Sequence, residues 1–227
     1  MPSFQELLDK YAFLAYEKQF RLSSLIGNHK WMLDVEKAKV SFNNKLVFPV
    51  HFLGTESTIT NTWLWADTNR KVGFPQHSIE LCRKVRSLGG QLGVSEFLTD
   101  SFSLVEEIGK PTGHTIAMVA TCLCGESCYY RGPHENGAVY VTLSDQRIDS
   151  KPDFDRSEFS RAFNELMWLP GDMKTRLVSY CSEKGYIGKD FKGDELTCQL
   201  NTGEKVSFTF KTTTDGGMSI SFLPMGS

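Results

Sequence analysis

Three cysteines fall within the short segment TCLCGESC, and two histidines lie near it; these residues are Cys122, Cys124, Cys128, His114 and His134. Thiolate sulfur and imidazole nitrogen are ligands that Zn²⁺ prefers, so the segment is a candidate metal site. The spacing is unfavourable, because residues two apart on a helix point about 200° apart. Cys122 and Cys124 therefore diverge if the preceding helix continues through both. We expect small buried thiols, no bound metal and no other cofactor.

No local motif identifies a catalytic site. The serine-hydrolase elbow, the paired histidines of zinc proteases, the P-loop and the dinucleotide glycine fingerprint are all missing from the sequence. Cys122 and Cys124 lie near the C-terminal end of a predicted helix, whose dipole raises a thiol pKa and disfavours a nucleophile. An acid–base pair could be formed by two of the carboxylates Glu56, Asp67 and Glu135. Solvated or ion-paired carboxylates are commoner. We assign no catalytic residue and favour a protein that is not an enzyme.

A group of aromatic and charged residues is the better candidate for binding. Trp63 and Trp65 share one face of a predicted strand, and Tyr129 and Arg131 share one face of another. If both strands belong to one sheet, the rings and the guanidinium could line a single surface. The candidate surface for a ligand or partner consists of Trp63, Trp65, Asp67, Tyr129, Arg131 and His134.

The same residues also have a purely structural interpretation. Tryptophans in strands usually pack inside a protein, so Trp63 and Trp65 are expected beneath the first helix, with at least one of them mostly buried. Arg131 would then pair with Glu56 or Asp67. The two interpretations differ in whether the indole rings reach the surface.

The elements that must position these residues begin with a helix. Ser3 followed by Glu6 predicts a capping box, and apolar residues recur at helical spacing up to about Gly27. Alternating apolar positions then predict three or more antiparallel strands, with NTWLWADTN as the next strand. Pro49 cannot donate to a sheet ladder, which places its strand at an edge or a bulge.

Two more helices and a hairpin follow. Helical spacing predicts a helix over 75–88 that stops at Gly89-Gly90. The segment HTIAMVATCLCG is apolar nearly all round and predicts a buried helix with a glycine C-cap. Asn136-Gly137 then predicts the turn of a two-stranded hairpin.

The polar segment SDQRIDSKPDFDR is the predicted linker to a C-terminal unit. Two short helices and three alternating strands follow it, which gives an α-α-β-β-β pattern with one apolar sheet face. We divide the chain into a main domain at 1–147 and a C-terminal unit at 148–227, which either extends the main sheet or forms a small second domain packed on it. The expected fold class is α+β, with an antiparallel sheet covered by helices, because βαβ alternation is missing.

Composition limits the partners. The 227-residue chain is long enough for one substantial core, and its formal net charge of -2 gives no basic field for phosphates, so we expect no nucleic acid partner. Its longest apolar run is shorter than the roughly 20 residues of a membrane span, so we expect no membrane partner. The N-terminus is acidic and amphipathic and lacks signal-peptide character, which predicts a cytoplasmic protein with reduced cysteines.

Several segments resemble a known family. They are EKQFRL, Trp31, LGTES, TWLWADTN and YYRGPHENGAVYVTL, spread over roughly residues 5 to 145. In combination they are similar to a family of uncharacterised bacterial proteins defined as a domain of unknown function. Asp67 and Thr68 stand where members often have another aromatic and a small residue. The resemblance implies a bacterial cytoplasmic origin and brings no activity, substrate or catalytic residue with it.

For function, these observations favour a non-enzymatic binding or protein-interaction module, of the small acidic kind that neutralises a partner protein. The alternative is an enzyme or small-molecule-binding protein with a pocket near Trp63, Trp65, Tyr129 and Arg131. A deep pocket with convergent titratable groups would favour the alternative, and a flat exposed patch would favour the interaction module.

Overall fold

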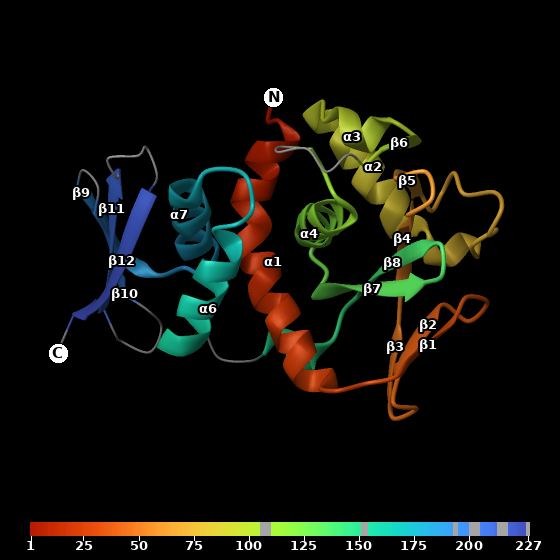
Figure 1. Cartoon of the computed structure of the whole chain (residues 1–227), viewed down its shortest axis with the longest axis horizontal. Helices are drawn as coiled ribbons and strands as arrows, with labels where there is room; N and C mark the ends of the chain where they lie inside the picture. The colour runs from red at the N-terminus through yellow and green to blue at the C-terminus, as the bar shows by residue number, and fades with distance from the viewer. Residues whose placement is uncertain (105–109, 151–153, 193–194, 200–204, 213–217, 226–227) are drawn as a thin grey trace.

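A computed structural model describes residues 1–104, 110–150, 154–192, 195–199, 205–212 and 218–225. Its helices and antiparallel sheets form the α+β fold that the sequence predicts. The long helix α1, Phe4–Ile26, runs through the middle of the molecule, with strands on both sides of it (Figure 1). Among the described residues, no helix is both long and apolar enough to cross a bilayer.

α1 begins at the predicted capping box. Ser3 Oγ accepts a hydrogen bond from Glu6 N, and the Glu6 carboxylate accepts one from Ser3 N, so two amides of the first turn are satisfied. The helix stops at Gly27, whose φ of 56° suits glycine. α1 contacts α4 on one side and α7 on the other, which makes it the central helix of the core.

The main sheet has five antiparallel strands in the order β6-β5-β4-β8-β7. The bounds are His51–Ser57 for β4, Thr62–Trp65 for β5, Ser101–Ser103 for β6, Cys128–His134 for β7 and Gly137–Leu143 for β8. β7 and β8 form the predicted hairpin, since their last pair is His134 with Gly137. The tryptophan strand β5 and the Tyr129–Arg131 strand β7 thus share one sheet, with β4 and β8 between them.

A separate small sheet lies beside the main one, in the order β1-β2-β3. Its strands are Trp31–Asp34, Lys39–Phe42 and Leu46–Pro49. Pro49 is on the edge strand β3, as its missing amide hydrogen predicts. The rings of Phe42 and Trp31 pack edge-on against Tyr130, with centroids 4.9 and 5.7 Å away. This sheet therefore covers the side of β7 opposite to Tyr129 and Arg131.

The second long helix differs from its prediction at both ends. α2 covers Glu80–Leu92, after a single 3-10 turn at Gln76–Ser78, and it is followed by the short helix α3, Ser95–Leu98. The helix continues through Gly89-Gly90, so these glycines do not end it. A Cβ atom at Gly89 would lie 2.1 Å from Phe97 Cβ. Glycine is required there because α3 packs directly on α2, which local sequence does not reveal.

α4, Gly113–Cys124, is the buried helix that the sequence predicts, and its C-cap is the left-handed Gly125 with a φ of 78°. Thr112 caps its N-terminus by accepting a hydrogen bond from Thr115 N. α4 lies between α1 and the main sheet (Figure 1). The first turn of α4 consequently faces the side chains that rise from β4, β7 and β8.

In the described residues from Gln146 onward, the C-terminal part of the chain forms three helices and a four-stranded antiparallel sheet in the order β12-β11-β10-β9. Its elements are α5 at Gln146–Asp149, α6 at Arg156–Leu166, α7 at Met173–Glu183, β9 at Ile187–Lys192, β10 at Glu195–Gln199, β11 at Lys205–Thr212 and β12 at Met218–Met225. The predicted meander corresponds to β10, β11 and β12. β9 is an additional strand, and the segment IGKDFK lacks the regular apolar alternation that would have predicted it.

The predicted linker is anchored to the rest of the protein. Phe154 is buried, and its ring meets that of Phe20 in α1 at 5.6 Å. Further along, the rings of Phe159 and Tyr180 lie 4.9 and 4.6 Å from that of Phe13. α6 and α7 therefore cover one side of α1, and both parts into which the sequence was divided contribute to burying this helix.

Candidate functional site

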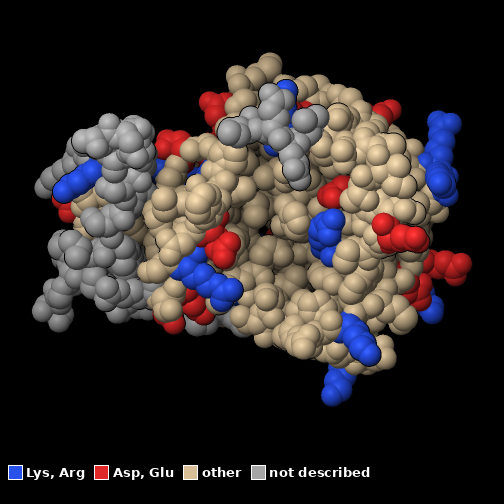
Figure 2. All heavy atoms as spheres, viewed as in Figure 1, with Lys and Arg blue, Asp and Glu red and all other residues tan. Residues whose placement is uncertain are grey.

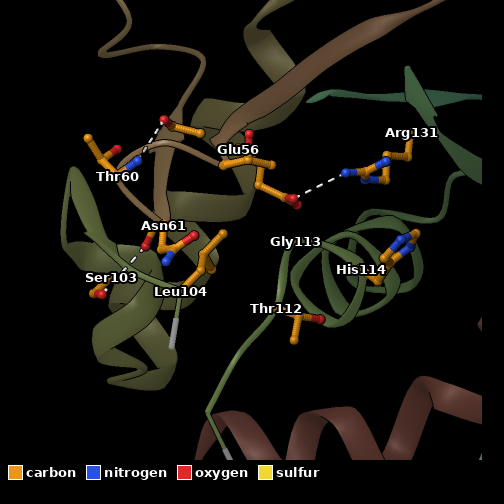
Figure 3. A pocket seen from close by; sticks show the side chains of 11 residues that line it. Glu56, Thr60, Asn61, Ser103, Leu104, Thr112, Gly113, His114 and Arg131 are labelled. Atoms are coloured by element: carbon orange, nitrogen blue, oxygen red, sulfur yellow. Dashed lines mark hydrogen bonds and ion pairs between the residues drawn. The ribbon is translucent and has the colours of Figure 1, made fainter. Parts of the chain in front are cut away.

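The described part of the chain contains a pocket of about 730 Å³ at the end of the main sheet where β4 turns into β5 (Figure 3). The β4–β5 turn, the edge strand β6 and the first turn of α4 bound it. Most of its lining side chains carry a hydroxyl or amide group: Ser57, Thr58, Thr60, Asn61, Ser103 and Thr112. Among the described lining residues, the two that carry a charge are Glu56 and Arg131.

Strand register explains why charged and aromatic side chains meet at this pocket. Glu56 in β4 lies opposite Trp63 in β5 and Ala138 in β8. Tyr140 is two residues further along β8 and lies opposite Arg131 in β7. Residues that are two apart on a strand, or opposite each other on neighbouring strands, project from the same face of a sheet. Glu56, Tyr140 and Arg131 therefore all project toward α4.

These three side chains form a closed hydrogen-bonded triangle. Tyr140 OH donates to Glu56 Oε2 at 2.6 Å, Arg131 Nε donates to Tyr140 OH at 3.1 Å, and Arg131 Nη2 donates to Glu56 Oε1 at 3.2 Å. Burial and the bond to Glu56 raise the pKa of Tyr140, so its phenol stays protonated and donates. Tyr140 is fully buried, whereas the side chains of Glu56 and Arg131 remain 18% and 30% exposed. Figure 3 shows Arg131 directed at Glu56 along one wall of the pocket.

The first residue of α4 packs directly on this triangle. A Cβ atom at Gly113 would lie 2.4 Å from Tyr140 OH and 2.5 Å from Glu56 Oε2, so any larger residue there must displace the ends of these two side chains. The positive end of the helix dipole is thus matched by the carboxylate of Glu56. Substitution of Gly113 would therefore disturb the hydrogen bond between Tyr140 and Glu56 in the wall of the pocket.

His114, the next residue in α4, extends the polar cluster to a second tyrosine. Its Nδ1 lies 3.1 Å from Tyr129 OH, and its ring packs edge-on against that of Tyr140 at 5.7 Å. Desolvation, followed by the positive charge of Arg131, lowers the pKa of His114. His114 is therefore neutral at pH 7, and Glu56 and Arg131 supply the opposite charges of the pocket.

All of these residues lie within the part of the chain that a known family covers. The sequence profile of a family of unknown function, DUF6882, matches residues 5–146. The chain belongs to this family. No curated protein and no solved structure matches it. The resemblance seen in the sequence is confirmed as one to an uncharacterised domain family, and the pocket lies within the domain that defines this family.

Trp63 and Trp65 belong to the core. Both are 0% exposed, and their rings lie 5.4 Å apart in an edge-on arrangement. Trp65 Nε1 donates to Glu96 O at 3.2 Å. A Cβ atom at Gly54 would lie 2.3 Å from Trp63 Cζ2, so the Trp63 ring occupies the space of a missing side chain. The prediction that at least one tryptophan is buried is confirmed, and neither ring can form an exposed ligand surface.

Asp67 likewise has a structural position. Its two carboxylate oxygens accept hydrogen bonds from Arg86 Nη1 at 3.0 and 2.9 Å, and Cys82 Sγ donates to it at 3.5 Å. Arg86 and Cys82 are both on α2. Asp67 therefore ties the loop after β5 to α2 and does not line the pocket.

Of the six residues proposed as a binding surface, Arg131 alone lines the pocket. Tyr129 is 5% exposed, beneath His114. His134 is exposed in the β7–β8 turn, where its Nδ1 accepts a hydrogen bond from Asn136 N at 3.3 Å. The structure thus joins Arg131 to Glu56, one of the two ion-pair partners expected for it.

Sequence reasoning missed Tyr140 and Gly113 as parts of the site. Alternation within GAVYVTL would place Tyr140 on one strand face, but it does not show which residues lie opposite. The need for glycine at 113 arises from contacts with residues 57 and 27 positions away in the chain, Glu56 and Tyr140. Only the strand pairing brings these residues together.

The cysteine segment shows no sign of chemistry. Burial raises the pKa of Cys122 to about 12 and that of Cys124 to about 11, so both thiols are protonated at neutral pH. A protonated thiol is a poor nucleophile and a poor metal ligand. Within the described ranges, no three His, Cys, Asp or Glu side chains come together as a metal site. That the protein contains no zinc stays a prediction.

Proposed function

We propose that this protein is a non-enzymatic binding module that holds a small polar molecule in the pocket beside α4. The observation that carries the proposal is the partly exposed pair of Glu56 and Arg131 in the wall of a 730 Å³ pocket. Ligand sites are typically concave and contain a few convergent polar groups that fix orientation. The hydroxyl groups around the pair suit a polar ligand better than an apolar one.

Two features favour binding over catalysis. Both oxygens of Glu56 accept hydrogen bonds, one from Tyr140 and one from Arg131, so the carboxylate is held in place rather than poised to take a proton. The nearby histidine, His114, has its Nδ1 engaged with Tyr129 OH. Among the lining side chains that the structure describes, none is therefore arranged as a nucleophile with an adjacent base.

We further propose a cytoplasmic location and no nucleic acid partner. The five cysteines whose side chains are described are free thiols, which suits a reducing compartment. On the face drawn in Figure 2, basic and acidic side chains are interspersed and do not gather into a patch of one sign. This face therefore presents no concentrated positive charge for a phosphate backbone.

The test is a thermal-shift screen of polar metabolites with two matched variants. Thr60 lines the pocket, whereas its neighbour Ile59 is 73% exposed and does not. A ligand at about 100 times its Kd adds roughly 2.7 kcal/mol to stability, which raises Tm by several degrees. We expect a compound that shifts the wild type and Ile59→Trp but not Thr60→Trp. A screen without such a compound would overturn the proposal.

A second candidate function is docking of a protein partner through the loop between α6 and α7. Trp168 is 88% exposed and Met167 is 52% exposed in this loop. The loop is braced from below by Arg176, whose Nη1 donates to Leu166 O at 2.8 Å and to Leu169 O at 3.0 Å. An exposed tryptophan on a rigid support is typical of an interface hot spot.

Affinity capture from the native host tests this second candidate. A specific partner should bind the wild type and be lost with Trp168→Ser. Met32, 60% exposed on β1, provides the control, because Met32→Ser removes a comparable exposed apolar side chain elsewhere. Equal capture by the wild type and Trp168→Ser would exclude the loop as the docking site.

A further inference from the structure

We propose that the ligand of this pocket is a small zwitterion, for which a free α-amino acid is the simplest class, with its ammonium group on Glu56 and its carboxylate on Arg131. The inference rests on the proposed function, that is, on the pocket being a ligand site. It adds the chemical class of the ligand and the orientation in which it binds.

The first observation is the balance of charge in the pocket. One carboxylate and one guanidinium line it, their nearest N and O atoms are 3.2 Å apart, and the remaining described lining residues are uncharged. A ligand with one net charge would be attracted by one of these groups and repelled by the other. A ligand that carries both charges a few atoms apart is attracted by both. Complementarity therefore favours a molecule that is neutral overall but charged at two adjacent groups.

The second observation is unused hydrogen-bonding capacity on both charged side chains. Arg131 donates from Nε to Tyr140 and from Nη2 to Glu56, and no described residue accepts a hydrogen bond from its Nη1. Each Glu56 oxygen accepts one hydrogen bond from a side chain, although a carboxylate can accept about four in all. Among the described contacts, both N–H groups of Nη1 and one of Nη2 are therefore spare, and they lie next to spare acceptor sites on Glu56.

The contact between the two charges can also be shared with a ligand. Arg131 reaches Glu56 through one nitrogen at 3.2 Å. A two-pronged guanidinium–carboxylate contact would be shorter and more rigid. A ligand carboxylate can therefore accept hydrogen bonds from Nη1 and from the second N–H of Nη2. Tyr140 meanwhile keeps Glu56 in position through its 2.6 Å hydrogen bond.

An anion bound at the N-terminus of α4 is the competing interpretation. Glu56 Oε2 already occupies this place, since it lies only 2.5 Å from where a Cβ of Gly113 would be. A second negative group there would be repelled by the carboxylate. The hydroxyl groups of Thr58, Thr60 and Thr112 are better placed to surround the polar part of a neutral molecule.

Isothermal titration calorimetry on the full chain tests the charge requirement. Each standard amino acid is compared with its N-acetyl derivative, which lacks the ammonium group, and its amide, which lacks the carboxylate. We expect at least one amino acid to bind with a Kd of about 1 mM or tighter, and both of its derivatives to bind about tenfold more weakly or worse. Binding of either derivative within about twofold of the amino acid would overturn the inference.

Two variants assign each charge to its partner. With Glu56→Gln, which keeps an acceptor for Tyr140, acetylation of the ligand should no longer weaken binding. With Arg131→Gln, amidation should no longer weaken binding. Combining each protein variant with each ligand derivative forms a double-mutant cycle, which separates the pairwise contact from general effects on the fold. If each variant weakens the amino acid and both derivatives by the same factor, the assigned orientation is wrong.

Failure of this inference is distinguishable from failure of the proposed function. If no amino acid binds but another metabolite shifts the Tm of the wild type and not of Thr60→Trp, the pocket is a ligand site and the zwitterion class is wrong. If no compound of either kind binds, both are overturned. Ile59→Trp serves as the control in each titration, since Ile59 lies outside the pocket lining.

Discussion

Two arginine–carboxylate pairs in this protein have the same chemistry but different surroundings. Arg176 and Asp9 lie between α7 and α1, where the guanidinium is fully buried and contacts Asp9 Oδ1 through Nε at 2.8 Å and Nη2 at 2.7 Å. Arg131 and Glu56 lie in the wall of the pocket, partly exposed, with a single 3.2 Å contact. All three nitrogens of Arg176 donate to described acceptors, whereas Nη1 of Arg131 has none among the described residues.

The difference separates a structural role from a binding role. Removing two charges from water is unfavourable, and a buried pair persists only when hydrogen bonds satisfy nearly every donor and acceptor. The interior pair meets this condition and has no capacity left for another molecule. The pocket pair is partly exposed, and its contacts with the described residues leave donors and acceptors unused. Unused hydrogen-bonding capacity, more than charge itself, therefore distinguishes the candidate site from the buried pair.

Removal of the C-terminal part should have the largest effect. Truncation after Ser150 would uncover Phe13, now packed against Phe159, and would leave Asp9 in α1 without Arg176. We expect fragment 1–150 to aggregate or to unfold without a cooperative transition, measured by circular dichroism in denaturant. A soluble, monomeric fragment that unfolds cooperatively would show that α1 does not depend on the C-terminal helices.

Arg176→Met should destabilise the whole chain by about 3–5 kcal/mol, because it leaves the Asp9 carboxylate buried without its partner. The measurement is the midpoint of denaturant unfolding at neutral pH. Adding Asp9→Asn to the same chain should recover part of the loss, since the orphaned charge is then gone. A loss below about 1 kcal/mol in the single variant would place this pair with the weak surface pairs.

Trp63→Ala should cost roughly 3–5 kcal/mol, because it leaves a cavity in the core beside Tyr140, whose ring is 5.2 Å away. Trp65→Ala should cost a similar amount. The matched control is Trp168→Ala, which removes an 88% exposed ring and should change stability by less than about 0.5 kcal/mol. If Trp63→Ala and Trp65→Ala both unfold at the denaturant midpoint of the wild type, the two rings do not pack in the core.

Glu56→Gln should change stability by about 1 kcal/mol or less, although it removes a charge of an ion pair. The glutamine oxygen can still accept the hydrogen bond from Tyr140, and Arg131 remains partly in water. Chemical denaturation against the wild type provides the value. A loss comparable to that of Arg176→Met would mean that the pocket pair is structural as well, and the contrast between the two pairs would disappear.

The smallest expected effect concerns zinc. Purified protein should contain no stoichiometric zinc, so treatment with a chelator should leave its Tm unchanged. Elemental analysis provides the measurement. About one equivalent of zinc, lost on Cys124→Ser or Cys128→Ser, would contradict this prediction.

Features fixed by neighbouring residues could be predicted from the sequence. The capping box of Ser3 and Glu6 and the turn at Asn136-Gly137 depend on residues within three or four positions of each other, so local patterns identify them. Strand alternation likewise places Trp63 and Trp65 on one strand face, and the usual packing of strand tryptophans predicts that at least one of them is buried. These predictions succeed because local geometry and tertiary packing agree.

The candidate site could be predicted only in part, because its members come from distant segments. Arg131 and Glu56 are 75 residues apart, and Tyr140 and Glu56 are 84 apart. Charge complementarity suggested that Arg131 would pair with Glu56 or Asp67. Only the strand order β4, β8, β7 shows that Glu56 is the partner. The continuation of α2 through Gly89 was mispredicted for the same reason, since Phe97 of α3 supplies the contact that requires glycine.

The position of α1 also affects the order in which the protein is made. Asp9 is synthesised well before its partner Arg176, which follows 167 residues later. At about 5–20 residues per second, the helix would wait roughly 10–30 s on the ribosome before its second side could be covered. During this interval Phe13 and Asp9 have no native neighbours from α6 or α7. The nascent chain is therefore a candidate for chaperone binding at its first helix until the C-terminal helices emerge.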